Sequence, residues 1–160
     1  MELHLVEVEI PDGLNVILGQ AHFIKTVDDL YQALAASSPG LRFGIAFCEA
    51  SGERLVRWAG NDEVLVGRAV DAARAVAAGH AFVVYLGDGY PVNVLNAVKQ
   101  VPEVCRVFCA TANPLQVVVA ESARGRGVLG VIDGSPPLGV EGDEDVASRR
   151  ELVRRLGYAP

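Results

Sequence analysis

Two histidines lie where neighbouring residues could support phosphate chemistry. His22 precedes Lys25 by three residues, and both come just before a segment with helical apolar spacing. An imidazole, an ammonium group and the free backbone N–H groups of a helix N-terminus can together surround a phosphate. His80 follows a glycine at the start of an apolar run. A lone histidine is more often a hydrogen-bonded structural residue, so a catalytic and a structural role are both open for each.

Polar side chains follow several apolar runs, at the points where strands are expected to end. These residues are Glu49, Ser51, Asp88, Thr111, Asn113 and Asp133. Polar residues interrupt strands at turns in most proteins. Several such ends side by side would nevertheless form a pocket with acceptors for ribose hydroxyls and donors for phosphate. The nearest cations in the sequence are Lys25 and Arg57.

Standard phosphate-binding and nucleophile motifs are missing from the chain. Residues 125–130, GRGVLG, match G-x-G-x-x-G, but a dinucleotide site needs a helix directly afterwards and a strand is expected here. The segment therefore predicts a glycine-rich hairpin, from which Arg124 or Arg126 could still reach an anion. There is no Walker A or G-x-S-x-G sequence, and no histidine spacing typical of a metal site.

Composition predicts one domain over residues 1–160, because this length suits a single buried core. The net charge of −6 with no basic cluster argues against nucleic-acid binding. No apolar run approaches the roughly 20 residues that span a bilayer, so we expect no membrane partner. Three cysteines without a CxxC pair predict buried thiols in a reducing compartment, which favours the cytoplasm.

The stretch Ala78–Lys99 organises the predicted fold, with a strand over 81–86, a turn over 87–91 and a helix over 92–98. Other strands are expected at 2–10, 15–18, 43–48, 54–58, 104–110, 115–120 and 127–132. Thr26 is expected to cap one helix in a capping box with Asp29, and Asn61 to cap the next. A loop over 133–142 precedes a last helix that ends near Leu156. The predicted class is α/β (α+β), a mixed sheet with helices packed on it.

Seven segments, taken together and in this order, resemble the adenosine-specific kinase family, a small domain of archaea and some bacteria. They are Gly19–Thr26, Phe43–Gly52, Gly60–Asp62, Ala78–His80, Pro91–Asn96, Cys109–Pro114 and Gly130–Gly134. The resemblance covers the chain from about Val6 to Tyr158. It implies a homo-oligomer, a trimer or hexamer, that binds adenosine or AMP. It also implies phosphate transfer from ATP to adenosine, with a histidine that carries the phosphoryl group stably.

Both His22 and His80 lie in family segments, and either could carry the phosphate. Under this hypothesis Lys25, or second Arg57, offsets phosphate charge. The proton acceptor for the 5′-hydroxyl, or the ligand of a possible Mg²⁺, would be Glu49, Asp88 or Asp133. Ribose or base would be read by Asn61, Asn93 and Asn113, which could equally be cap and turn residues.

Two other functions are compatible with the same sequence. A non-catalytic protein could bind adenosine or AMP in this pocket as a regulator, which the absence of a kinase loop favours. A purely structural oligomer with an apolar interface is the third reading, supported only by a hydrophobic content of 51%.

Overall fold

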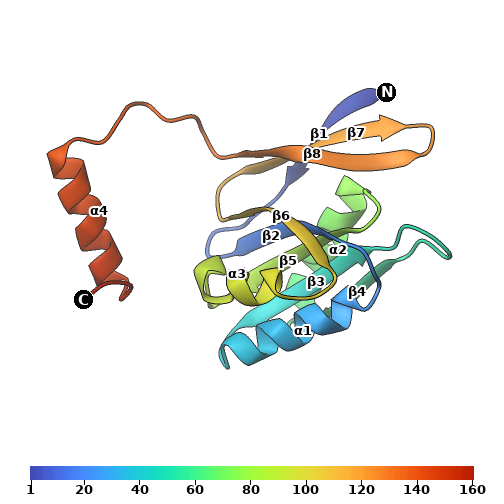
Figure 1. The fold of residues 1–160 in the computed structure, drawn as a ribbon, viewed down its shortest axis with the longest axis horizontal. Helices are drawn as coiled ribbons and strands as arrows, with labels where there is room; N and C mark the ends of the chain where they lie inside the picture. The colour runs from blue at the N-terminus through green and yellow to red at the C-terminus, as the bar shows by residue number, and fades with distance from the viewer.

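Strand β5 (Ala81–Gly87) lies at the centre of the fold, and all seven of its residues are buried. Its Val, Phe and Tyr side chains suit a strand that is covered on both faces. The computed structural model describes residues 1–160 and places β5 between β2 (Asn15–Ala21) and β3 (Arg42–Cys48). With β4 (Val56–Gly60) and β6 (Val104–Thr111) at the edges, the sheet has the order β4-β3-β5-β2-β6 (Figure 1).

A second sheet contains β1 (Glu2–Val8), β7 (Leu115–Ser122) and β8 (Gly125–Asp133), in the order β1-β7-β8. The predicted α+β class, with helices packed on a sheet, is confirmed. Every strand pair is antiparallel, however, so neither sheet is mixed. The reason lies in the helical connections. Helix α1 connects β2 and β3, which run in the same direction, but β5 lies between them in the sheet and runs the opposite way. Helix α3 likewise connects β5 and β6, and β2 lies between these two strands.

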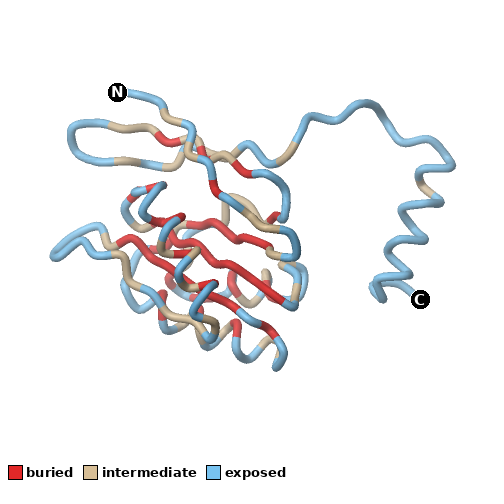
Figure 2. Tube along the Cα trace, turned by 180° about the vertical axis from the view of Figure 1, so that it is seen from behind, coloured by how far each residue is buried: buried red, intermediate tan, exposed pale blue.

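Both faces of the larger sheet are covered. Helices α1 (Thr26–Ser37) and α3 (Pro91–Lys99) pack on one face, where Leu30, Leu34 and Val98 are fully buried. Helix α2 (Glu63–Val76) and the inner face of the smaller sheet cover the other. In Figure 2 the strands of the larger sheet form the buried interior and the outer surfaces of the helices are exposed. Polar side chains are thereby confined to the strand ends and outer surfaces.

Helix α2 lies close against β3 because both elements carry small residues at their contact. A Cβ atom added to Gly44 would collide with the backbone of Leu65 and Val66. Ala69 and Ala73, on the same face of α2, are fully buried. The small side chains let the backbones approach, which in turn places the C-terminal end of α2 beside the β3–β4 loop.

The chain ends in an arm that stands away from the body, residues 134–160, hereafter the C-terminal arm (Figure 1). Its loop leads to α4 (Asp143–Arg155), as predicted, and α4 has no buried residue. Leu138 and Val140 are completely exposed. The arm's one side-chain hydrogen bond to the body runs from the Asn93 Nδ2 to the Tyr158 hydroxyl at 3.4 Å. None of the four helices is long and apolar enough to cross a membrane.

Three local predictions need correction. Lys25, and not Thr26, precedes the first residue of α1, and the Thr26 hydroxyl instead donates to the Phe23 carbonyl. The N-cap of α2 is Asp62, whose side chain accepts a hydrogen bond from Leu65 N at 3.0 Å, and not Asn61. The cysteines are free, but only Cys48 is buried, whereas Cys105 is exposed on the edge strand β6.

The contact between β3 and α2 gives a matched pair of glycine substitutions. Gly44→Ala should lower the free energy of unfolding by about 1–3 kcal/mol, because its methyl group forces the α2 backbone away. Gly67 lies in α2 with open space around it. Gly67→Ala should therefore raise the free energy of unfolding by about 0.5–1 kcal/mol. Urea unfolding of both variants checks the pair. Equal effects would show that α2 does not pack this closely on β3.

Candidate functional site

The residues predicted to carry function divide between opposite ends of the five-stranded sheet. One end, hereafter the histidine end, holds His22, Lys25, Glu49, Ser51, Arg57 and His80. The other end, hereafter the aspartate end, holds Asn61, Asp88, Asn93, Thr111, Asn113 and Asp133. Strand β5 separates His80 from Asp88, and its seven residues span about 20 Å at the usual rise. Within one chain the two sets cannot share a substrate's reacting atoms.

Backbone hydrogen bonds bring the two histidines together. The His80 carbonyl accepts from Ala21 N at 2.9 Å, directly before His22. The His80 N–H donates to the Cys48 carbonyl at 2.7 Å, and His22 N donates to the Glu103 carbonyl at 3.0 Å. His22 and His80 therefore lie at neighbouring strand ends.

The two histidine side chains differ in their surroundings. His22 is exposed beside Phe23, with ring centroids 6.5 Å apart. His80 is partly buried and stacks on Phe47 with centroids 5.8 Å apart. His80 also has a φ of 66°, which costs a non-glycine residue of the order of 1 kcal/mol. His22 is thus open to a ligand, whereas one face of His80 is covered.

Lys25 is held by two carboxylates. Its ammonium group contacts Asp29 and lies 3.4 Å from Glu103 Oε1. The Asp29 hydrogen bond raises the pKa of Lys25 above its usual value, and Lys25 in turn lowers the pKa of Asp29. Lys25 is therefore a fixed cation beside His22, already partly neutralised.

Glu103 is a residue of this end that sequence reasoning missed. It is only 4% exposed, and its Oε2 atom is buried without a hydrogen-bond partner. An incompletely paired buried carboxylate is costly and is common at functional sites. Its signal in the sequence was an acid between the apolar residues Val101 and Val104.

The N-terminus of α1 does not offer the free N–H groups that the phosphate hypothesis assumed. Thr26 N donates to the Phe23 carbonyl at 3.0 Å, and Val27 N donates to the Ile24 carbonyl at 3.3 Å. A short turn before the helix satisfies these donors. Phosphate at this position would have to rely on side chains.

Glu49 and Arg57 form a second polar pair at the histidine end. Arg57 Nη2 lies 3.2 Å from both carboxylate oxygens of Glu49, and Leu55 N donates to Glu49 Oε2 at 3.0 Å. The Leu55 N–H and then Arg57 lower the pKa of Glu49. Ser51 lies exposed in the same β3–β4 loop, where its carbonyl accepts from Arg54 N at 3.3 Å.

A cleft of about 870 Å³ opens at the histidine end, on the α2 side of the sheet. Its walls are the β3–β4 loop, the last turn of α2 and the β7–β8 hairpin, which all lie at the right of Figure 1. Gly79 lines it, directly before His80. The hairpin is the one predicted for residues 125–130. Both arginines of the hairpin, Arg124 and Arg126, line the cleft. Arg54 and Arg74 also line it, and neither was predicted from the sequence.

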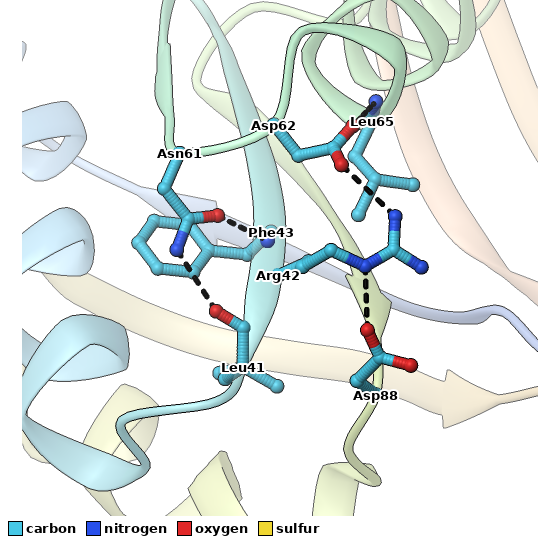
Figure 3. A network of polar contacts seen from close by, with 7 residues as sticks. All are labelled: Leu41, Arg42, Phe43, Asn61, Asp62, Leu65 and Asp88. Carbon is cyan, nitrogen blue, oxygen red and sulfur yellow. Dashed lines mark hydrogen bonds and ion pairs between the residues drawn. The ribbon is translucent and has the colours of Figure 1, made fainter.

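The aspartate end is built from satisfied structural contacts. Arg42 joins Asp62 at 2.9 Å and Asp88 at 2.6 Å, while Asn61 bridges the Leu41 carbonyl and Phe43 N–H, each at 2.8 Å (Figure 3). The Leu65 N–H, followed by Arg42, lowers the pKa of Asp62.

The remaining predicted residues of the aspartate end also bind one another. Thr111 Oγ1 and Asn113 Nδ2 donate to Asp133 Oδ1 at 2.6 and 3.1 Å, which fixes the β6–β7 turn against the end of β8. Asn93 Oδ1 accepts from Tyr90 N at 3.1 Å and so caps α3. These contacts support the cap and turn roles that the sequence left open. No group of three or more His, Cys, Asp or Glu side chains is arranged to hold a metal ion.

Comparison with known proteins identifies the type of domain. The sequence model of the adenosine specific kinase family matches residues 6–159. A solved relative, described as the crystal structure of PH1918 protein from Pyrococcus horikoshii OT3, is 44% identical, with a TM-score of 0.95. The match covers 99% of this chain and 98% of that one, and therefore includes the C-terminal arm. No curated protein sequence matches.

The contacts of Asp62 predict a pH-dependent contribution to stability. Asp62→Ala should lower the free energy of unfolding by about 1 kcal/mol at neutral pH, because α2 loses its cap. The pKa of Asp62 is lowered by folding, so its contribution is present above the ordinary value of about 3.9 and is lost as the pH falls through the folded value.

Urea unfolding at pH 7 and pH 3 tests this. The difference between the natural protein and Asp62→Ala should shrink at the lower pH. Asp71→Ala, on the exposed side of the same helix, is the control and should change little at either pH. A constant difference would mean that the charge of Asp62 contributes nothing.

Proposed function

Because this chain belongs to the adenosine-specific kinase family, we propose that it transfers phosphate from ATP to adenosine, giving ADP and AMP. The observation that carries this proposal is the convergence of His22 and His80 at one end of the sheet, where backbone hydrogen bonds join their strands. His22 N donates to the backbone of Glu103, whose carboxylate holds Lys25, and a cation and a carboxylate near the reacting nitrogen are what phosphoryl transfer requires.

In the proposed reaction, His22 is the phosphoryl carrier because it is the more exposed of the two histidines. Its imidazole nitrogen forms a bond to the γ-phosphorus of ATP, and the bond from that phosphorus to the bridging oxygen breaks, releasing ADP. The 5′-oxygen of adenosine then attacks the phosphorus, and the N–P bond breaks. Lys25, fixed by Asp29 and Glu103, offsets charge on the phosphoryl oxygens. Mg²⁺ would enter with the phosphates of ATP.

Within a single chain, Glu49 accepts the proton of the 5′-hydroxyl, because the other two candidate carboxylates, Asp88 and Asp133, lie at the aspartate end. Glu49 is partly exposed, and its lowered pKa keeps it ionised at neutral pH, as a proton acceptor must be. His80 stacks on the buried Phe47 with one face of its ring, and the other face is suited to an adenine ring.

A non-catalytic adenosine- or AMP-binding protein remains the second candidate. The observation that favours it is the pairing of both predicted phosphate cations, since Lys25 and Arg57 already contact carboxylates. The N–H groups at the start of α1 are also occupied. On this reading adenosine would bind at the histidine end without turnover.

Incubation with ATP, Mg²⁺ and adenosine, followed by chromatography of AMP and ADP, separates the two functions. We expect equal formation of AMP and ADP that depends on adenosine. His22→Ala should reduce it by at least about 100-fold. His80→Asn, which tolerates the same backbone conformation, should weaken adenosine binding more than turnover. Lys99→Ala, at the end of α3 and outside both sets of residues, is the control.

Adenosine binding measured by calorimetry without any AMP formation would favour the regulatory protein. If neither histidine substitution affects AMP formation, the phosphohistidine step is wrong.

We also propose that the protein self-associates, as a trimer or hexamer, through the C-terminal arm. Two apolar surfaces lack a partner within one chain. The arm exposes Leu138, Val140 and Leu156, and the outer face of the smaller sheet exposes Leu3 and Leu5 on β1. Burial of such surface is worth about 25 cal/mol per Å². The match to a solved relative along the arm indicates that its course is a shared feature. Three thiols kept free fit a location in the cytoplasm.

Sedimentation velocity of Leu138→Asp combined with Leu156→Asp tests the proposed association. Both side chains are exposed in one chain, so the substitutions should leave the body folded and shift the mass to that of a monomer. Val64→Asp, at an exposed apolar residue of α2, should keep the assembly. An unchanged mass in the double variant would exclude the arm as the interface.

A further inference from the structure

The cleft at the histidine end has an uneven distribution of charge. Every carboxylate that lines it has an arginine partner. Glu49 and Glu53 bind Arg57, at 3.2 and 3.3 Å, and Glu121 binds Arg126 at 2.9 Å. Three further arginines line the same cleft and have no acidic partner. These are Arg54, Arg74 and Arg124.

The three unpaired arginines come from three separate elements. Arg54 lies in the β3–β4 loop with a φ of 53°, Arg74 in the last turn of α2, and Arg124 in the β7–β8 turn. A basic residue in a last helical turn is commonly explained by the helix dipole. That explanation accounts for Arg74 alone. Nor does an excess of basic residues explain the cluster, because the chain has a net charge of −6.

Arg126 holds the walls of the cleft together. Its Nη1 atom donates to the Ala75 carbonyl of α2 at 3.4 Å, while its Nε atom donates to Glu121 Oε2 at 3.0 Å. The guanidinium thus connects the β7–β8 hairpin, which carries Arg124, to α2, which carries Arg74.

We propose that this cleft binds the triphosphate chain of the nucleoside triphosphate that donates the phosphoryl group, an assignment that rests on the proposed function. Guanidinium groups bind phosphate oxygens in a bidentate manner, and three of them match a chain with several negative charges. The volume of about 870 Å³ lies within the range of small-ligand sites. Glu49 lines the cleft, and so does Gly79, which directly precedes His80 in the chain. The cleft's unpaired arginines add to the positive charge of Lys25, which two carboxylates already partly neutralise.

Calorimetric titration of the full-length protein with inorganic triphosphate tests the cleft directly. Combining Arg74→Gln with Arg124→Gln removes two charges without breaking any ion pair, and should weaken triphosphate binding by about tenfold or more. The control is Arg150→Gln with Arg155→Gln, which removes the same charge from α4, where neither side chain is paired. It should change the affinity by less than about twofold. Equal loss in both double variants would overturn the proposal, because it would indicate attraction to net charge alone.

Competition identifies the ligand that the cleft takes. ATP should displace inorganic triphosphate from the natural protein, and the cleft variant should raise the KM for ATP while the Kd for adenosine stays the same. If ATP does not compete, the cleft is not the donor's site. Failure of the proposed function has a different signature: arginine-dependent triphosphate binding would persist while no AMP forms.

Discussion

The burial of β5 on both faces is the constraint on which the rest of the structure depends. A strand between two apolar layers leaves no room for unpaired polar groups along its length, so such groups gather beyond its two ends. Because β5 pairs between β2 and β3, the polar groups of these two strands also lie at the strand ends. His22, His80 and Glu103 are thereby brought together from segments far apart in the sequence.

The two ends of the sheet use polar residues in different ways. At the aspartate end each polar side chain binds another or a backbone group, as Arg42, Asn61 and Asp133 illustrate. Such networks fix turns and helix starts. At the histidine end a buried carboxylate oxygen and three arginines lack partners. Incomplete pairing of this kind favours a functional site there.

The sequence was sufficient to predict elements whose signals are local. The apolar run of β5, the turn before Pro91 and the last helix all form as their residue patterns indicate. The division of the functional residues could not be predicted, because strand order is decided by pairing between distant segments. Strand-following positions such as Glu49 and Asp88 look alike in sequence, yet they lie at opposite ends. The roles of Glu103 and Arg74 likewise could not be predicted, because they depend on side chains from distant segments that lie beside them in the fold.

The length of β5 has a consequence for how the two ends can influence one another. Residues separated by about 20 Å of packed sheet normally contribute independently to the free energy of unfolding. Within one chain, therefore, the effects of changing Arg42 and of changing His22 are additive. A measurable coupling energy between them would therefore point to contact between two copies, in which the aspartate end of one meets the histidine end of the other. Double-mutant cycles across the sheet would test for such a contact.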